Sequence, residues 1–487
     1  MARLNAHQLA PAGAVYRSVS AFGLRTDLQL PAGVWQIGII AVALLLGAFA
    51  SVQPKLAVGA ILGLVLGAVV LSSLAVGLAV LVALSFFEDY SEIAGGVSLT
   101  KVVGLLLAVA LLAAIAVGRQ EEREARDLVA RQPALVVVVG LFMAWAAISL
   151  VWAERWHSGT PTLGRFALNF ALFPIAFAAL RTRRHVVWLF AVFVASALLS
   201  VGFGLLQEPD PSKPWVGRLG GAGLNPNQLG GMLAVSVVLA AALAANRRWH
   251  PVTRIGALAA GAGCGAGLFL TVSRGALLGL GVSLLVAPFA VGRGRRAAAF
   301  VLIVLALAGT VGWFAAVASD ADVDRITHPE GSSGGSGRED LWRVGWRMAE
   351  AHPVTGVGVG NFQVSSIHYL IEPGAVLRDE YILDRPLVAH NIYLHVLSEL
   401  GIVGLTLFAL LLILSLGTML DAARAFSRQG DPTSEILARA LFIAVVGLLA
   451  ADFFSSQLLS KQLWLLLATG PALQAIAHRR DRDTPAA

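Results

Sequence analysis

Residues 390–418 read HNIYLHVLSELGIVGLTLFALLLILSLGT, and this stretch decides the fold class. Residues 400–420 carry no charge and are long enough to cross a hydrocarbon core of roughly 30 Å as a helix. A long polar segment, residues 318–390, comes directly before it. A polar motif opens the stretch and comprises His390-Asn391-Ile392-Tyr393-Leu394, Glu399, Gly401 and Gly404. A titratable side chain, a water-facing segment and a helix entering a bilayer therefore coincide here.

The rest of the chain has the same apolar character. Of its 487 residues, 57% are hydrophobic and only 13% are charged, which is more apolar surface than one soluble core would bury. The apolar runs are continuous and show none of the alternation of β-barrel strands. The sequence predicts an all-α polytopic membrane protein.

Hydrophobic runs predict about 12–14 transmembrane helices. The segment 56–88 is almost unbroken, so it forms either two short spans that turn at Ser72-Ser73 or one long tilted helix. The predicted spans are 33–51, 56–71, 74–88, 99–118, 134–152, 165–180, 185–206, 227–245, 254–271, 275–292, 297–317, 391–418, 436–454 and 462–477.

Basic residues set the predicted orientation. The net charge of +7 comes from arginine clusters in alternate loops and at both termini, which is the positive-inside pattern of a membrane protein rather than a nucleic-acid-binding surface. Both termini and these loops are therefore expected in the cytoplasm. The clusters in the loops are Arg119 to Arg131, Arg181 to Arg184, Arg247 to Arg254, Arg293 to Arg296, and Arg424 with Arg428.

These observations predict five regions along the chain. They are a cytoplasmic leader (1–32), a first transmembrane bundle (33–317), a large external loop (318–390), C-terminal transmembrane helices (391–477) and a cytoplasmic tail (478–487).

The external loop is predicted to be partly helical. Its Gly/Ser-rich residues 331–337 suggest a flexible hinge, and apolar residues at helical spacing predict a short amphipathic helix between Glu339 and His352. The glycine-rich run 356–361 permits tight turns and close backbone approach, so we expect another part of the protein or a ligand to pack there.

His390 is the leading candidate for a catalytic base. A neutral imidazole accepts a proton from a hydroxyl at ambient pH, and a helix start favours the neutral ring. Asn391, His395 and Glu399 follow at four-residue spacing on one helix face. The alternatives are an interfacial histidine that caps the helix, and a Glu399 that only bonds His395.

Two arginines are candidate anion ligands. Arg274 interrupts two apolar runs, and Arg218 lies in a glycine-rich turn before Asn225-Pro226-Asn227 at the head of a span. A guanidinium and the free amides of a helix start both suit a diphosphate. The alternatives are an Arg274 that snorkels to lipid phosphates and a plain turn around Arg218. Arg338 is a further outward-facing cation that solvent alone would accommodate.

Several common catalytic motifs are missing from the sequence. It has no Walker A pattern, no Cys/His set with zinc spacing and no His-Glu-x-x-His, and its one Gly-x-Ser-x-Gly match, residues 331–335, belongs to a low-complexity Gly/Ser stretch rather than to a strand-to-helix turn. ATP-driven transport, zinc hydrolysis and serine esterase chemistry therefore lack support, and no cofactor is expected.

The ordered set of motifs resembles the O-antigen ligase and O-antigen polymerase-like family, bacterial membrane glycosyltransferases that use polyprenyl-diphosphate-linked glycans. The resemblance covers roughly residues 130–475. Its most specific element is His390-Asn391-x-Tyr393-Leu394 with Glu399, Gly401 and Gly404 after a long loop. The supporting elements are Arg218 with Asn225-Pro226-Asn227, Ser273-Arg274-Gly275, Gly337-Arg338 with Trp342, and the segment Pro353 to Phe362.

The resemblance implies a GT-C-like enzyme in the bacterial cytoplasmic membrane with its active site facing the periplasm or exterior. Arg218 and Arg274 would bind an undecaprenyl-diphosphate-linked glycan donor, and His390 would take the proton from an acceptor glycan or glycolipid hydroxyl, with inversion and without a metal. Asn391, Glu399, Asn225, Asn227 and Arg338 would support this site. A polymerase of lipid-linked repeat units and a protein-glycosylating transferase share this donor chemistry. A secondary transporter, a lipid-glycan flippase and a non-catalytic scaffold remain alternatives from other classes.

Overall fold

The structure is a computed structural model of the whole chain. It describes residues 65–88, 92–94, 97–116, 127–208, 217–246, 249–291, 338–370 and 388–483, together with Gly63, Trp215, Arg296 and Gly312. The predicted span 33–51, the predicted span 297–317 except Gly312, most of 56–64 and the Gly/Ser-rich residues 331–337 lie outside these residues.

The described residues form an all-α membrane protein, as predicted. Eight of their helices are long and apolar enough to cross a membrane. They are α5 (Leu99–Ala116), α7 (Pro133–Ile148, continued by the 3-10 turn η3, Ser149–Val151), α8 (Trp156–Ala179), α9 (Arg183–Leu206), α10 (Pro226–Ala244), α11 (Pro251–Leu270), α18 (Ile392–Arg428) and α19 (Pro432–Ala451, continued by the 3-10 turn η5, Asp452–Phe454).

Shorter or more polar elements complete the described part. The apolar helices α4 and α12 span Leu74–Ser85 and Arg274–Ala290, and α20 spans Lys461–Asp483. Helices α15 (Arg338–Ala351) and α16 (Phe362–Leu370) belong to the predicted external loop, so the amphipathic helix expected there is confirmed. A small antiparallel hairpin pairs β1 (Glu92–Ala94) with β2 (Val97–Ser98).

The helical residues of the segment 65–85 are interrupted at Ser73. Ser73 has an extended backbone (φ −152°, ψ 115°), and its Oγ accepts a hydrogen bond from the Val76 amide, which makes it the N-cap of α4. Residues 65–72 are helical before it. The segment therefore contains two helices that meet at Ser73.

Helix α8 begins earlier than its apolar run predicts. The expected span starts at residue 165, whereas the helix starts at Trp156 and includes much of the predicted loop 153–164. Packing explains the extension, because a Cβ on Gly159 would lie only 2.5 Å from the Val359 carbonyl oxygen of the external loop. A tertiary contact, rather than hydrophobicity, stabilises these first turns.

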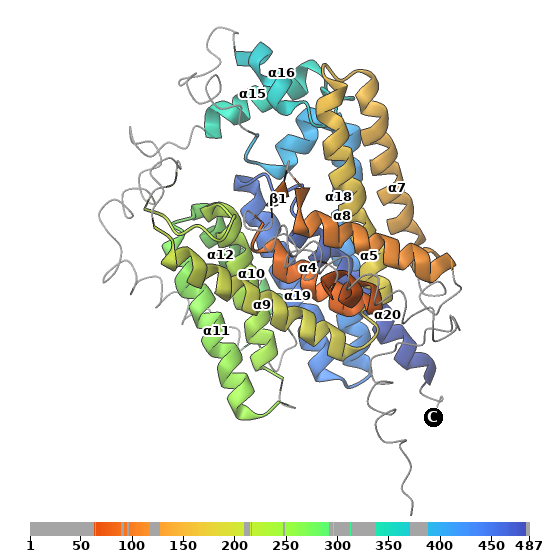
Figure 1. Cartoon of the computed structure of the whole chain (residues 1–487), viewed down its shortest axis with the longest axis vertical. Coiled ribbons are helices and arrows are strands. Elements are labelled where there is room, and N and C mark those ends of the chain that lie inside the picture. The colour runs from red at the N-terminus through yellow and green to blue at the C-terminus, as the bar shows by residue number, and fades with distance from the viewer. Residues whose placement is uncertain are drawn as a thin grey trace, which may run out of the picture.

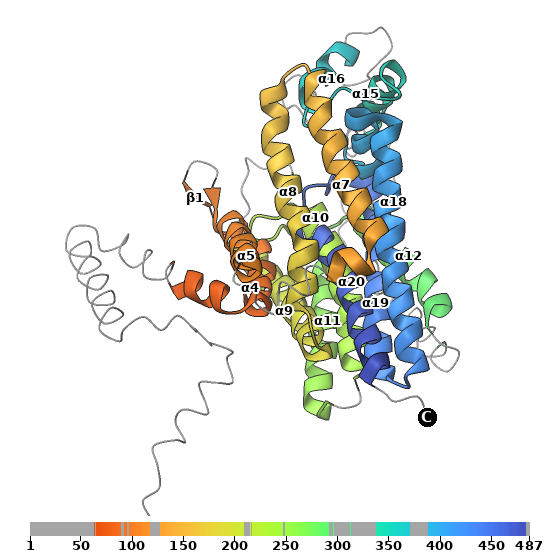
Figure 2. The same cartoon turned by 90° about the vertical axis from the view of Figure 1, so that its right-hand side faces the viewer.

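The long helices form a bundle that α15 and α16 cover at one end (Figures 1 and 2). Helices α7, α8 and α18 run side by side from that end (Figure 2), and α20 packs against α8 and α18. Aromatic rings hold these four helices together: Phe142 of α7 meets Phe166 of α8 at 5.5 Å between centroids, and Phe170 of α8 meets Trp464 of α20 at 4.7 Å. Helices α10, α11, α12 and α19 form the other part of the bundle.

Helix α18 is broken at Gly401, and the break anchors the loop of residues 353–362. Gly401 has φ 65° and ψ −168°, a conformation that favours glycine. The break leaves carbonyl groups of the preceding turn without helical hydrogen bonds, and loop amides bond to them instead. The Val357 amide donates to Ser398 O (3.0 Å), and the Gly358 amide donates to Glu399 O (2.9 Å). On the other side of the break, the Ile402 amide donates to Pro353 O (2.8 Å). Backbone groups of the loop thus replace the helical hydrogen-bond partners that are missing at the break.

A side chain on Gly401 is predicted to loosen this insertion. In Gly401→Ala the new Cβ would lie 2.1 Å from the Val354 carbonyl oxygen and would require a strained positive φ. We expect a loss of at least about 2 kcal/mol of stability. The thermal unfolding midpoint in detergent measures it.

Gly417→Ala in the same helix is the matched control. No atom of the described residues lies within 4 Å of its Cβ position, and alanine favours a helix. Equal midpoints for the two variants would contradict the role assigned to Gly401.

Candidate functional site

Glu399 fastens the loop of residues 353–362 to α18. Its Oε2 accepts a hydrogen bond from the Gly360 amide (2.8 Å), and its Oε1 accepts one from the Phe362 amide (3.0 Å). His395 Nε2 lies 3.3 Å from Oε1, so the expected contact between these side chains is present. The carboxyl is only 3% exposed, and backbone amides supply most of its partners. Glu399 therefore holds the loop rather than facing a substrate.

The glycine run packs against the helix bundle, which confirms the close approach predicted there. Gly356, Gly358 and Gly360 have φ values of +66°, +98° and +69°. A Cβ on Gly358 would lie 2.6 Å from the Ala153 Cβ, and one on Gly360 would lie 2.7 Å from the Ser158 carbonyl oxygen. Only glycine meets both the conformation and the space at these positions.

Asn361 ties the same loop to the start of α8. It is fully buried, its Oδ1 accepts a hydrogen bond from the Arg155 amide (2.9 Å), and its Nδ2 donates to Val359 O (2.9 Å). The Val359 amide donates to Ser149 Oγ (3.0 Å). Residues 353–362 are therefore bonded to three helical segments.

His390 lies just before α18 in a left-handed conformation (φ 50°). The next residue, Asn391, is the helix N-cap, because its Oδ1 accepts from the Tyr393 and Leu394 amides at 3.0 Å each. The cap role considered for His390 thus belongs to Asn391. Burial lowers the pKa of His390 from 6.5 to about 4, with smaller contributions from the positive charges of Arg338 and His395.

Arg218 is bonded to the turn that precedes α12. Its Nε donates to Thr271 O (2.9 Å), and its Nη2 donates to Asn227 Oδ1 (3.1 Å). The same Asn227 oxygen accepts from Ser273 Oγ (3.0 Å). Asn227 therefore joins the Arg218 turn to the residue before Arg274.

Two helix starts meet at this turn. Asn225 caps α10 through the Asn227 and Gln228 amides, both at 3.0 Å, and Ser273 caps α12 through the Ala276 amide (3.4 Å). Arg274 is the first residue of α12 and is half-buried. Asn227 thus joins the Arg218 side chain to the turn in which Arg274 follows Ser273. We call Arg218, Asn227, Ser273 and Arg274 the arginine turn.

The 3-10 turn η5 lies between the arginine turn and the start of α18. A Cβ on Gly275 would be 2.9 Å from the Phe454 Cβ, so η5 packs on the first turn of α12. On its other side Phe453 contacts Tyr393, with ring centroids 6.4 Å apart, and Tyr393 Oη donates to Leu449 O (2.9 Å). The first turn of α12, which follows the arginine turn, and the first turn of α18, which follows His390, therefore both contact η5.

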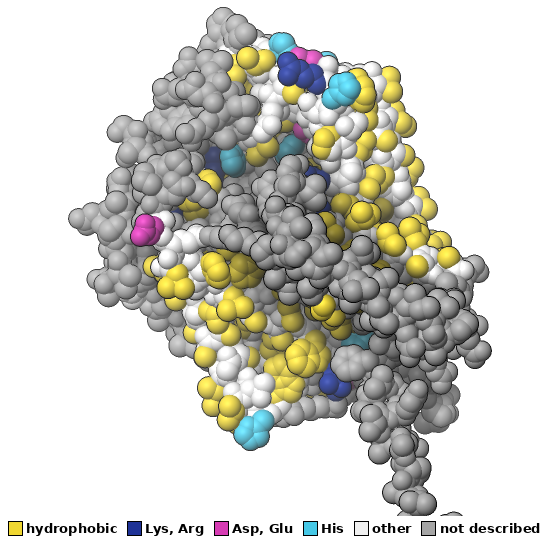
Figure 3. Space-filling view, viewed as in Figure 1, with side chains coloured by type: hydrophobic (Ala, Val, Ile, Leu, Met, Phe, Trp, Pro, Cys, Tyr) yellow, Lys and Arg dark blue, Asp and Glu magenta, His cyan; other side chains and the backbone are white. Residues whose placement is uncertain are grey.

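Arg338 joins the His390 side of this arrangement. It is the first residue of α15 and lowers the pKa of His390 through its charge. Figure 3 shows histidine and basic side chains gathered in a hollow beneath α15 and α16. Helix α15 also contacts η5, because Trp342 lies 5.5 Å from Phe453 between ring centroids.

The sequence did not predict two features near His390 and the arginine turn, namely the hydrogen bonds of Glu399 and the buried Asp452. The bonds from Glu399 to loop amides were not anticipated, although the glycine run and the Glu399/Gly401 pair were both noted. Asp452, buried in η5, was overlooked. The signal for it was available, since it is a lone acid near the end of an apolar run.

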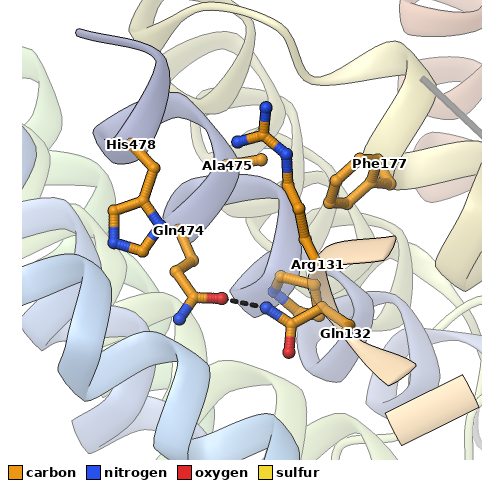
Figure 4. A pocket seen from close by; sticks show the side chains of 7 residues that line it. Arg131, Gln132, Phe177, Gln474, Ala475 and His478 are labelled. Atoms are coloured by element: carbon orange, nitrogen blue, oxygen red, sulfur yellow. Dashed lines mark hydrogen bonds between the residues drawn. The ribbon is translucent and has the colours of Figure 1, made fainter. Parts of the chain in front are cut away.

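A cavity of about 360 Å³ lies toward the C-terminal end of α20, away from α15 and α16. Gln132 donates to Gln474 across it, and Arg131 and His478 also line it (Figure 4). His478 and Gln474 also contact Asp421 of α18. These bonds link α7, α18 and α20, and none of the predicted site residues lines the cavity.

No group of three or more His, Cys, Asp or Glu side chains is arranged as metal ligands within the described residues. The sequence predicted three cationic side chains near His390 and in the arginine turn, and all three carry guanidinium groups: Arg218, Arg274 and Arg338. An anion is therefore the ligand class that this arrangement suits.

Part of the chain is similar to a known family. Residues 258–409 match the family model described as O-antigen ligase, and the predicted resemblance is confirmed. The match includes Ser273-Arg274, α15, the glycine run and His390 to Gly404, whereas Arg218 and Asn227 lie before it. No curated protein matches the chain.

Replacing the carboxylate of Glu399 by an amide is predicted to weaken the attachment of the loop to α18. An amide at this position offers one acceptor oxygen, so in Glu399→Gln one of the two loop amides loses its partner. We expect a loss of about 1–3 kcal/mol, read as a lower unfolding midpoint.

Glu350→Gln provides the comparison, since Glu350 is exposed on α15 and bonds only Trp346 in the described residues. Its expected effect is below about 0.5 kcal/mol. A Glu399→Gln midpoint as high as that of Glu350→Gln would rule out the fastening role.

Proposed function

We propose that this protein of the O-antigen ligase-like family transfers a glycan from a polyprenyl-diphosphate donor to a sugar hydroxyl. The observation that supports it most is the arginine turn. One amide oxygen, Asn227 Oδ1, accepts from both Arg218 and Ser273, and the residue after Ser273 is Arg274. Two guanidinium groups at two helix starts form a suitable site for a doubly charged diphosphate.

The arginine turn would activate the leaving group. Arg218 and Arg274 would bind the diphosphate oxygens, and their charge would stabilise the polyprenyl diphosphate anion as the bond between the anomeric carbon and the diphosphate oxygen breaks. Because positive charge at the diphosphate is supplied by two arginines, we propose that the reaction needs no metal ion.

His390 would act as the base. The acceptor hydroxyl oxygen attacks the anomeric carbon from the face opposite the diphosphate, which inverts that carbon, while its proton passes to the imidazole. Burial and the charge of Arg338 oppose protonation of His390, so the ring is neutral at ordinary pH, and the neutral ring is the form that acts as a base.

The distribution of charge supports an external active site. Arg181, Arg183, Arg254, Arg424 and Arg428 lie at the helix ends opposite α15 and α16. By the positive-inside rule we propose that those ends are cytoplasmic and that His390 and the arginine turn face the periplasm or exterior.

Alanine variants are predicted to separate the role of His390 as the base from the role of Arg274 in binding the diphosphate. His390→Ala should lower kcat by about 10²–10⁴-fold with little change in donor KM, because a base acts in the reaction step. Arg274→Ala should raise donor KM as well, because it binds the diphosphate. Turnover of purified protein with undecaprenyl-diphosphate-linked glycan and candidate glycan acceptors measures both.

Two exposed residues of the external loop serve as controls: His352→Ala and Arg343→Ala should keep normal kinetics. Normal turnover by His390→Ala, together with normal donor KM in Arg274→Ala, would contradict the proposed site.

The pH profile provides a separate prediction. Neutral His390 is the active form and its pKa is about 4, so kcat/KM should stay level as the pH falls below 6.5 and should decline only near pH 4. Arg338→Gln removes a positive charge that opposes protonation, so it should move this decline to higher pH. A decline centred near 6.5 in the unmodified protein would exclude a buried His390 as the base.

A further inference from the structure

Asp452 is a buried acid whose carboxyl group has no hydrogen-bond partner within the described residues. The residue is 1% exposed, the lowest value among the described acidic residues, and no group in the described part of the chain donates a hydrogen bond to either carboxyl oxygen. Burying a carboxyl group without a partner is costly, so proteins seldom keep one that has no use. In a membrane protein such an acid commonly marks a substrate site.

Other unpaired polar atoms lie on residues that follow Asp452 or contact its turn. Ser456 Oγ and Gln457 Nε2 are buried and unpaired directly after η5. Trp342 Nε1 is a third such atom, and its ring contacts Phe453 and Phe454 of η5 at 5.5 and 5.9 Å between centroids. Together they offer a carboxyl group, a hydroxyl, an amide donor and an indole donor.

This combination suits a sugar ring. Vicinal hydroxyls donate to a carboxylate and accept from amide and indole N–H groups, while the C–H face of a sugar packs on aromatic rings. Phe453, Phe454 and Trp342 supply such rings. An anion is a poor match because of the carboxyl group, and a lipid tail is a poor match because of the unpaired polar atoms.

The position of η5 specifies which sugar would bind. The first turn of α12 packs on η5 at Gly275, the residue directly after Arg274. A sugar bonded to a diphosphate in the arginine turn would therefore extend toward η5. Tyr393, three residues after His390, packs on its other side.

We propose that Asp452, Ser456, Gln457 and Trp342 form the subsite for the sugar attached directly to the donor diphosphate. The proposal rests on the proposed function, because the diphosphate places that sugar beside η5. Trp342 covers η5 from α15 in this structure, so the sugar enters as the contacts of Trp342 with Phe453 and Phe454 open.

Binding of two lipids tests the subsite. The probes are undecaprenyl diphosphate alone and undecaprenyl diphosphate bearing one hexose, each titrated into the full-length protein in detergent. The unmodified protein should bind the hexose-bearing lipid about 10-fold more tightly. Asp452→Asn should lose most of this difference and keep the affinity for bare undecaprenyl diphosphate.

Two further variants separate binding from folding. The carboxyl oxygens of Asp452 accept no hydrogen bond within the described residues, so Asp452→Asn should unfold at the same temperature as the unmodified protein or higher. Trp342→Phe keeps an aromatic ring without the N–H and should reduce the 10-fold preference in part. Asp421→Asn, an acid near the other end of α18, should leave the preference unchanged.

The outcomes distinguish the two proposals. Equal affinity of the unmodified protein for both lipids, or an unchanged preference in Asp452→Asn, overturns the subsite alone. Failure of the unmodified protein to bind either lipid overturns the proposed function and the subsite with it. A lower affinity of Asp452→Asn for both lipids to the same extent also overturns the subsite, since it would place Asp452 in diphosphate binding.

Discussion

The bonds from Glu399 to the Gly360 and Phe362 amides are the interaction on which the candidate site depends most. They join a loop outside the bundle to a helix inside it, across the break at Gly401. The broken helix would otherwise leave carbonyl groups unpaired, and the loop would otherwise leave amides unpaired. Each segment therefore supplies the partners that the other lacks. The glycines at 356, 358 and 360 are needed because the loop must approach the helices closely.

This anchoring explains how a loop helix reaches the site. The segment 353–362 joins α15 to α16, and α15 packs on α18. Arg338 and Trp342 are both on α15, where Arg338 acts on His390 by its charge and Trp342 contacts η5. A loop that fluctuated freely would hold neither contact. The pKa of His390 near 4 depends on this arrangement, since it arises from burial and from the charge of Arg338.

Much of the fold followed from hydrophobicity and helix signals. The described spans lie close to the predicted ones, and Ser73, Asn225 and Asn391 all cap helices, as such residues often do. The early start of α8 was not predictable, because it comes from contact with a loop two hundred residues away. The break at Gly401 was also missed, since a glycine in an apolar run indicates neither a kink nor its partner.

The site was predicted in part. Sequence order and charge pointed to Arg218, Arg274 and His390, and the family match covers two of the three. The role of Asn227 as the shared acceptor required coordinates, because it depends on two turns meeting at one oxygen. Asp452 was overlooked because its significance is the lack of a partner, which only a packed structure reveals.

The central claim is that the arginine turn and His390 serve one substrate on two sides of η5. An experimental structure of the protein in a lipid nanodisc with undecaprenyl diphosphate tests it most directly. The account predicts diphosphate density in contact with both Arg218 and Arg274, with its free end directed toward η5 and His390. Diphosphate density elsewhere, or density that contacts neither arginine, would contradict it.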